Sequence, residues 1–464
     1  MQVAHWVGRE ADEILGKVTP HLYLEFEGQG LEAERLAVAV EKLCRRHPML
    51  SLRIDAEGHQ TVDAVGRPLR LDVEDMTVLD TEALAHRLAA KREEWSHRRA
   101  DLRVAPPAAV SLSLLPEGRA RLHVDTDMLA IDPASMRIVM EVLARFYEGG
   151  ADEGELSAES PPSFFSWAER LASDPELRAQ RERDRLWWRQ HIADIPGAPP
   201  LPFLPDDASR AVHTDRFAAT LSPAERSSLE QVARRCCVTT STLLLGVFAL
   251  SLSQATATEK FRLSVPGFWR APLVEGVDGI VGEFSNVLVL GVDIRPAESL
   301  ERLLARLVGD MNGLLAHQSY PGVSVMRDLS RLHGGLQTSP VVFTAGVDLP
   351  GGELFSERVG RVFGPMIHTV SQGPGVALDA QVAALDGGLL INWDVRLDAL
   401  PESWLRALFD TYAALLRRLA ASPDLVSETV ERFGLQAPEA TAQTKGKPME
   451  RPLSALQKAY LLGR

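Results

Sequence analysis

The stretch Leu122-His123-Val124-Asp125-Thr126-Asp127-Met128-Leu129-Ala130-Ile131-Asp132-Pro133-Ala134-Ser135 carries carboxylates into an otherwise apolar segment that heads into a core. An ionised carboxylate is tolerated in a core only where a cation or several hydrogen-bond donors meet it. We therefore expect Asp127 and Asp132, at the end of a strand, to line a cavity or to form a structural ion pair.

The sequence around this stretch predicts alternating strands and helices. Residues 108–115 and 119–125 predict two strands joined by a turn, and residues 135–147 have the three-and-four apolar spacing of a helix. Asp127 and Asp132 therefore fall in a strand-to-helix connection. The same alternation continues along the chain, which predicts an α/β or α+β fold.

Length and composition restrict the class of protein. The chain has 464 residues, which predicts about three units or two large ones at roughly 150 residues each. A hydrophobic fraction of 45% and a charged fraction of 24% are typical of soluble globular proteins. The formal charge of -13 argues against binding to a phosphate backbone, so we expect no nucleic-acid partner.

The cysteines and the apolar runs predict a cytoplasmic location. The three cysteines, two of them adjacent, offer no plausible disulfide framework, which favours a reducing compartment. No apolar run reaches the roughly 18 residues that span a bilayer, and residues 1–9 lack the order of a signal peptide. We therefore expect no membrane partner and no export.

Two changes in composition suggest boundaries along the chain. Residues 151–162 are rich in acidic residues, Ser and Pro, and residues 436–451 lack periodicity. We predict an N-terminal lobe over 1–175, a C-terminal lobe over 176–432, and a linker followed by the start of a second domain over 433–464.

The second-domain prediction depends on a short internal match. Residues 456–464 align with residues 1–9, sharing Gln, Ala, Gly and Arg in register. Either the match is chance, or the chain was cut from a longer polypeptide that holds a second copy downstream.

Eight motifs occur in order along most of the chain. They are Gln2-x-Ala4-x-Trp6-x-Gly8-Arg9, His21-x-Tyr23-x-Glu25-Phe26, Arg46-His47-Pro48-Met49-Leu50, Asp127-x4-Asp132-x2-Ser135, Trp187-Trp188-x3-Ile192-x2-Ile195-Pro196-x-Ala198-Pro199, Val281-Gly282-Glu283-Phe284, Pro340-Val341-Val342-Phe343-Thr344 and Val376-x-Leu378-Asp379-x-Gln381. In these motifs the sequence resembles the heterocyclization domains of nonribosomal peptide synthetases, a branch of the condensation-domain superfamily.

The resemblance implies a fold and a reaction. The implied fold is a pair of chloramphenicol-acetyltransferase-like lobes that form a V-shaped pseudo-dimer with a central tunnel. The implied enzyme joins a donor acyl or peptidyl thioester to carrier-bound Cys, Ser or Thr, and then cyclizes and dehydrates the product to a thiazoline or oxazoline, as in siderophore assembly. The implied partners are donor and acceptor peptidyl carrier proteins and neighbouring synthetase domains, including a second heterocyclization domain.

The resemblance assigns the proton transfers of ring formation to Asp379 and Thr344. Asp379 lies in the first strand of a hairpin predicted to turn at Asp386-Gly387, and Thr344 follows an apolar run, so both are polar residues at the mouth of buried strands. A carboxyl in hydrogen-bond reach of the new ring can donate and accept protons, and a neighbouring hydroxyl can orient it. The alternative is a turn or ion-pair role for Asp379 and a purely structural Thr344.

The Asp-x4-Asp motif distinguishes this branch from amide-forming relatives, which carry His-His-x3-Asp-Gly at this place. Met128 stands at the second His position, and a thioether cannot serve as a base, so an imidazole mechanism is excluded there. We favour a structural role for Asp132, with Arg270 as its candidate partner and Ser135 in the same motif. Asp127 is expected to shape the channel or to contact substrate.

The sequence departs from the family near Asp379. Relatives usually carry Gln and Trp where Gly375 and Ala377 stand, so we expect a wider and less hydrogen-bonded pocket. Trp269, where relatives have Asn, is expected to add bulk to the channel, and Gln381 to shape the pocket.

Cofactor chemistry is not expected within the chain itself. His47 and His123 lack a second ligand at metal-binding spacing, and no phosphate-cradling loop is present. We expect no metal and no intrinsic cofactor, with substrates arriving on the phosphopantetheine of carrier proteins. Two further readings stay open: a tandem copy that performs condensation only, or a non-catalytic scaffold that docks carriers.

Overall fold

The computed structural model describes residues 2, 15–16, 18–55, 57–62, 69–149, 163–205, 207, 210–349 and 352–433. The internal match between residues 1–9 and 456–464 lies outside these residues, apart from Gln2, as does the predicted linker beyond residue 433.

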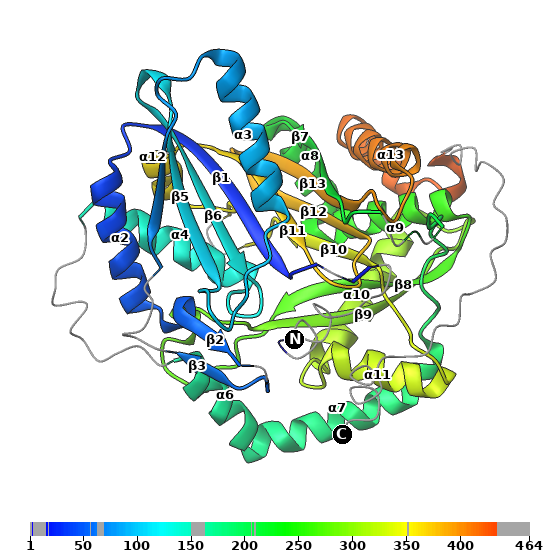
Figure 1. Ribbon diagram of the computed structural model, residues 1–464. Coiled ribbons are helices and arrows are strands. Elements are labelled where there is room, and N and C mark those ends of the chain that lie inside the picture. Colours follow the sequence, from blue (N-terminus) through cyan, green and yellow to red (C-terminus); the bar gives the residue numbers. More distant parts are fainter. Residues whose placement is uncertain are drawn as a thin grey trace.

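Two main sheets organise the described chain (Figure 1). The first sheet has the order β11 (Met366–Gln372), β1 (His21–Gln29), β6 (Arg119–Asp127), β5 (Ala108–Leu114) and β4 (Leu71–Asp75). The second has the order β7 (Thr214–Leu221), β13 (Gly388–Arg396), β12 (Leu378–Leu385), β10 (Val341–Gly346), β8 (Lys260–Phe268) and β9 (Ser285–Asp293). A small ribbon pairs β2 (Leu52–Ile54) with β3 (Gln60–Val62). The predicted mixed α/β class is confirmed.

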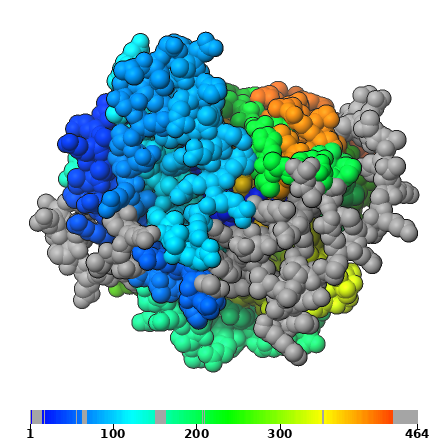
Figure 2. All heavy atoms as spheres, in the orientation of Figure 1, coloured from blue at the N-terminus to red at the C-terminus, as the bar shows by residue number. Residues whose placement is uncertain are grey.

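Helices cover both sheets. The first sheet packs α2 (Ala33–Arg46) and α4 (Pro133–Tyr147) on one face and α3 (Thr81–Ser96) on the other. The remaining helices are α6 (Phe164–Ser173), α7 (Pro175–His191), α8 (Pro223–Arg235), α9 (Thr240–Thr256), α10 (Leu300–Ala316), α11 (Gly322–His333), α12 (Glu357–Phe363) and α13 (Glu402–Ala421). In Figure 2 the blue and cyan N-terminal segments and the orange and green C-terminal segments occupy opposite upper sides of the visible face.

Local signals explain where several elements begin and turn. Helix α4 begins at Pro133, two residues before the predicted start, with Asp132 as N-cap accepting from the Ser135 N–H and Pro133 at the first helical position. The predicted hairpin of β12 and β13 is also confirmed. Its two turn residues, Asp386 and Gly387, have φ of 52° and 76°, the left-handed backbone that a two-residue hairpin turn requires.

The packing crosses the division predicted at residue 175. Strand β11, from the predicted C-terminal lobe, pairs with β1 of the first sheet, and α12 packs against α4 through Val359 and Phe363. β11 thereby covers backbone groups of β1 that would otherwise form an open sheet edge. Neither β11 nor α3 was predicted from the sequence, and the lobe boundary at residue 175 stays a prediction.

Within the described residues no single helix is long and apolar enough to span a membrane. Only α8 and α9, bent by 94° at their junction, reach that length and apolarity as a pair.

Candidate active site

A cavity of about 230 Å³ is lined by residues of both sheets. The first sheet and its helix α4 contribute apolar side chains, among them Leu22, Leu24, Met128 and Met136. The second sheet contributes a polar group made up of Thr344, Asp379, Gln381 and Asn392. A concave, mostly apolar pocket with a few convergent polar groups is the usual form of a small-molecule site.

Strand register brings Asp379 and Thr344 together. β10 runs parallel to β12, with Val342 opposite Asp379 and Thr344 opposite Gln381. Because side chains alternate between the faces of a sheet, Asp379, Gln381 and Thr344 project to the same side. Thr344 Oγ1 donates to Asp379 Oδ1 at 3.3 Å, and Gln381 Nε2 donates to Asp379 Oδ2 at 2.8 Å. The predicted pair is therefore observed, with Gln381 as its stronger hydrogen-bond donor.

Burial raises the pKa of Asp379 to about 6, although hydrogen bonds from Gln381, Thr344 and Ser371 lower it. All of these donors are neutral, so they only partly offset the loss of solvent. A carboxyl with a pKa near neutrality can both accept and donate a proton at working pH.

Asp132 and Ser135 connect α4 to the loop before β9. Asp132 Oδ2 accepts from the Phe284 N–H at 2.8 Å, and Arg270 Nη2 lies 3.8 Å from Asp132 Oδ1. Ser135 Oγ accepts from Arg270 Nη2 at 2.9 Å and donates to the Gly282 carbonyl at 2.9 Å. The ion pair predicted between Asp132 and Arg270 is confirmed, and its contacts are those of a structural clamp.

Asp127 lies beside the cavity without lining it. Its side chain is buried and accepts from the Leu129 N–H at 3.0 Å, and Met128 is the residue of this turn that lines the cavity. Asp127 thus stabilises the turn that carries Met128 to the cavity, and its role toward channel or substrate stays a prediction.

Three residues predicted to shape the pocket do not line the cavity. Ala377 is buried in the core of the second sheet, Gly375 has φ of +80° in the turn before β12, and Trp269 packs against the core of the first sheet. The expected widening of the pocket and the expected bulk at Trp269 therefore stay predictions, because the lining alone does not compare this pocket with those of relatives. Gly373, Val376 and Phe268 line the cavity in their place.

Asp394, which was not predicted from the sequence, borders the site. It lies opposite Asp379 on β13, and its Oδ2 accepts from Gln381 Nε2 at 2.8 Å. A signal was present, because Asp394 is a carboxylate within the apolar run 388–395, the same pattern that drew attention to Asp127.

Metal-binding geometry occurs at two places among the described residues, and neither includes a residue of the cavity. One group is Glu93, His97 and His213, and the other is Asp55, Glu57 and His59. His97 already uses both ring nitrogens, one toward the Glu93 carbonyl at 3.0 Å and one accepting from the Thr214 N–H at 3.1 Å.

Comparison with known proteins gives a consistent family. Residues 19–427 match the Condensation domain family. The chain is 38% identical over 428 residues to phenyloxazoline synthase MbtB of Mycolicibacterium paratuberculosis, covering 91% of this chain and 36% of that protein. It is 30% identical over 425 residues to pyochelin synthetase PchE of Pseudomonas aeruginosa, covering 91% and 29%. The chain thus spans about a third of the length of these curated relatives.

Solved structures agree. The cyclization-docking bidomain of EpoB from Sorangium cellulosum superposes with a TM-score of 0.79 at 26% identity, covering 91% of this chain and 83% of that one. The first condensation domain of the calcium-dependent antibiotic synthetase shares the fold, with a TM-score of 0.72 at 21% identity, covering 94% and 97%. The chain therefore belongs to the condensation-domain family and is a homologue of nonribosomal peptide synthetase cyclization domains.

Proposed function

We propose that this domain joins a carrier-bound acyl or peptidyl thioester to carrier-bound Cys, Ser or Thr and then closes and dehydrates the product to a thiazoline or oxazoline. The observation that carries the proposal is Asp379, a carboxyl with a raised pKa at the polar end of a cavity lined from both sheets.

The first step forms an amide. The acceptor amine attacks the donor thioester carbonyl, the C–N bond forms, the C–S bond breaks, and the donor arm leaves as a thiol. In the second step the acceptor side chain attacks the new amide carbon, whose oxygen becomes a hydroxyl. Loss of that hydroxyl as water, with loss of the nitrogen proton, leaves the C=N bond of the ring.

Asp379 is proposed to move both protons of the dehydration. Its ionised form accepts the N–H proton, and its protonated form gives a proton to the departing hydroxyl, so the residue returns to its starting state. The pKa of about 6 makes both forms accessible near neutral pH. Thr344 is proposed to orient the carboxyl through its hydrogen bond to Oδ1.

The substrates are proposed to arrive on the phosphopantetheine arms of two carrier proteins, from opposite ends of a tunnel between two lobes in V-shaped arrangement. The domain is proposed to bind no cofactor of its own. We propose that the reaction runs in the reducing cytoplasm, which agrees with three free cysteines. A neighbouring second cyclization domain is proposed as a partner in the same assembly.

Mass spectrometry of loaded carriers tests the proposal. Wild-type protein should yield a product lighter than the linear amide by one water, and Asp379→Asn should accumulate the amide, with ring closure slowed by about 10²- to 10⁴-fold. Asp386→Asn is the matched control, because the same substitution is made in an exposed hairpin turn that accepts Asn.

The alternative functions give different products. A condensation-only domain would accumulate linear amide in the wild type, and a docking scaffold would give neither product. Ring closure by Asp379→Asn at the wild-type rate would contradict the assignment of Asp379.

A further inference from the structure

A second buried carboxyl, Asp394, stands opposite the proposed proton-transfer residue. Asp394 on β13 is the register partner of Asp379 on β12, and three elements converge on it. From β11 the Ser371 N–H donates to Asp394 Oδ2 at 2.7 Å, although β11 belongs to the other sheet. The carboxyl therefore lies where the two sheets meet.

Gln381 connects the two carboxyls through one nitrogen. Its Nε2 donates to Asp379 Oδ2 at 2.8 Å and to Asp394 Oδ2 at 2.8 Å. An amide nitrogen has two hydrogens, so these two bonds use both and fix the plane of the amide. Without Asp394, one hydrogen would lose its acceptor, and only Asp379 and the 3.4 Å contact from Asn392 Nδ2 to Gln381 Oε1 would hold the amide in place.

Only Oδ2 of Asp394 accepts hydrogen bonds, because Oδ1 has no hydrogen-bond partner among the described residues. Burial raises the pKa of Asp394 well above its ordinary value, the charge of Asp379 raises it further, and Arg216 on β7 lowers it. Arg216 directs Nη1 to His368 Nδ1 at 3.5 Å, and Arg396, which also borders this region, pairs with Asp398. Burial thus favours the protonated form of Asp394, and its Oδ2 serves as a hydrogen-bond acceptor for Gln381 and Ser371.

We propose that Asp394 is a positioning residue for ring closure: it holds the Gln381 amide in place against Asp379. The inference rests on the proposed function of Asp379 and adds a residue that acts through Gln381 without touching substrate.

The test measures the ratio of linear amide to ring in the carrier assay, because both products come from the same folded molecules and the ratio is independent of the active fraction. Asp394→Ala should raise this ratio about tenfold, the effect of losing one hydrogen bond. Asp394→Asn should restore most of the ring closure, because its carbonyl oxygen can accept from Gln381 and Ser371 as Oδ2 does. The double variant Asp394→Ala with Gln381→Ala should be no worse than Gln381→Ala, because both residues act through one contact.

Three results would overturn the inference: a wild-type ratio in Asp394→Ala, an Asn variant as defective as the Ala variant, or additive effects in the double variant. Asp379→Asn, run in parallel, separates the two proposals. If it closes rings normally, the proposed function fails; if it accumulates amide while Asp394→Ala does not, only the positioning role fails.

Discussion

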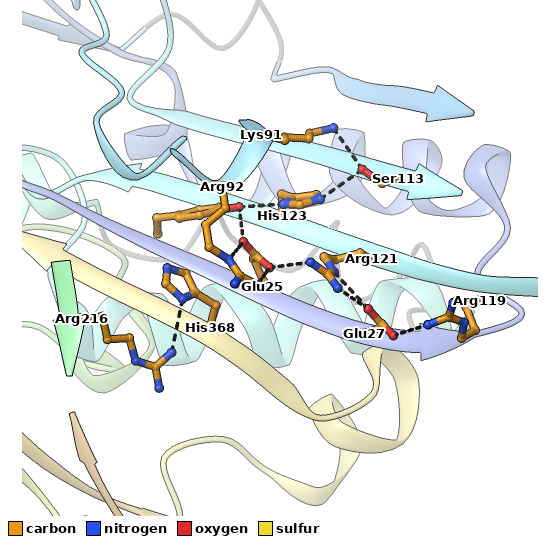
Figure 3. A network of polar contacts seen from close by, with 11 residues as sticks. Glu25, Glu27, Lys91, Arg92, Ser113, Arg119, Arg121, His123, Arg216 and His368 are labelled. Carbon is orange, nitrogen blue, oxygen red and sulfur yellow. Dashed lines mark hydrogen bonds and ion pairs between the residues drawn. The ribbon is translucent and has the colours of Figure 1, made fainter. Parts of the chain in front are cut away.

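Two buried carboxyls in this molecule differ in the charge of their hydrogen-bond donors. Glu25 in the first sheet is bound by arginines, whereas Asp379 in the second sheet has only neutral donors. Glu25 is fully buried between Arg92, which binds both of its oxygens at 2.7 and 2.6 Å, and Arg121 at 3.2 Å (Figure 3). Burial alone would raise its pKa, but Arg92 lowers the pKa to about 2. Asp379 has only neutral donors, and its pKa is about 6.

The network around Glu25 is extended by neutral side chains. Tyr23 Oη donates to Glu25 at 2.9 Å and contacts His123 at 2.7 Å. The other ring nitrogen of His123 contacts Ser113 at 3.1 Å (Figure 3). Burial lowers the pKa of His123 to about 3, so the ring is neutral. Because arginines balance its negative charge, Glu25 stays ionised across the working pH range, which suits a structural role. Asp379 has no such cation beside it, so it can gain and lose a proton.

The largest expected effect comes from removing the charge of Glu25. Glu25→Gln removes the counter-charge of Arg92 and leaves Arg121 with Glu27 alone, and it should lower the free energy of unfolding by about 3–5 kcal/mol, measured by urea denaturation. Glu27→Gln is the control, because Glu27 pairs with Arg119 and Arg121 at a more exposed position and should cost about 1 kcal/mol or less. Equal losses of stability in the two variants would contradict the view that Glu25 is the more strongly compensated of the two carboxylates.

The pH dependence of stability should differ in sign between the two carboxyls. Glu25 has a lowered native pKa, so its contribution is complete above pH 4.5 and is lost as pH falls toward 2. Asp379 has a raised native pKa, so it costs no stability below about pH 3.8, and stability falls as pH rises from there to 6. Each contribution reaches about 3 kcal/mol at most, less for Asp379 because it borders the cavity.

Urea titrations between pH 3 and 8 measure these slopes. Relative to wild type, Asp379→Asn should gain stability between pH 4 and 6 and keep that gain at pH 7, whereas Glu25→Gln should lose the slope below pH 4.5. If the stability of Asp379→Asn has the same pH dependence as that of the wild type, the pKa of Asp379 is not raised in solution. The difference between Asp379 and Glu25 would then not hold.

The smallest expected effect concerns a single neutral donor. Thr344→Val removes the hydroxyl that stabilises ionised Asp379, so the pKa of Asp379 should rise further and ring closure should slow by about three- to tenfold. Thr344→Ser keeps the hydroxyl and should restore the rate. The pH profile of ring closure measures the shift, and an unchanged profile in the Val variant would contradict an orienting role.

Part of the site follows from the sequence because short-range interactions set it. The hairpin turn at Asp386-Gly387 and the N-cap at Asp132 depend on backbone conformations within a few residues, and strand periodicity places Asp379 and Gln381 on one face. Arg270 and Asp132 are far apart in the chain, and their pairing was predicted through the family resemblance. The ion pair is observed.

Only the tertiary structure decided which strands meet. The pairing of β11 with β1 and the arginines that surround Glu25 join residues far apart in the chain, and no local pattern encodes such contacts. The tertiary structure also decided that Trp269 packs against the core of the first sheet, that Ala377 lies in the core of the second, and that Phe268 lines the cavity. The sequence by itself determined the elements and the residue types at their ends; long-range packing determined which carboxyl meets arginines and which keeps a titratable proton.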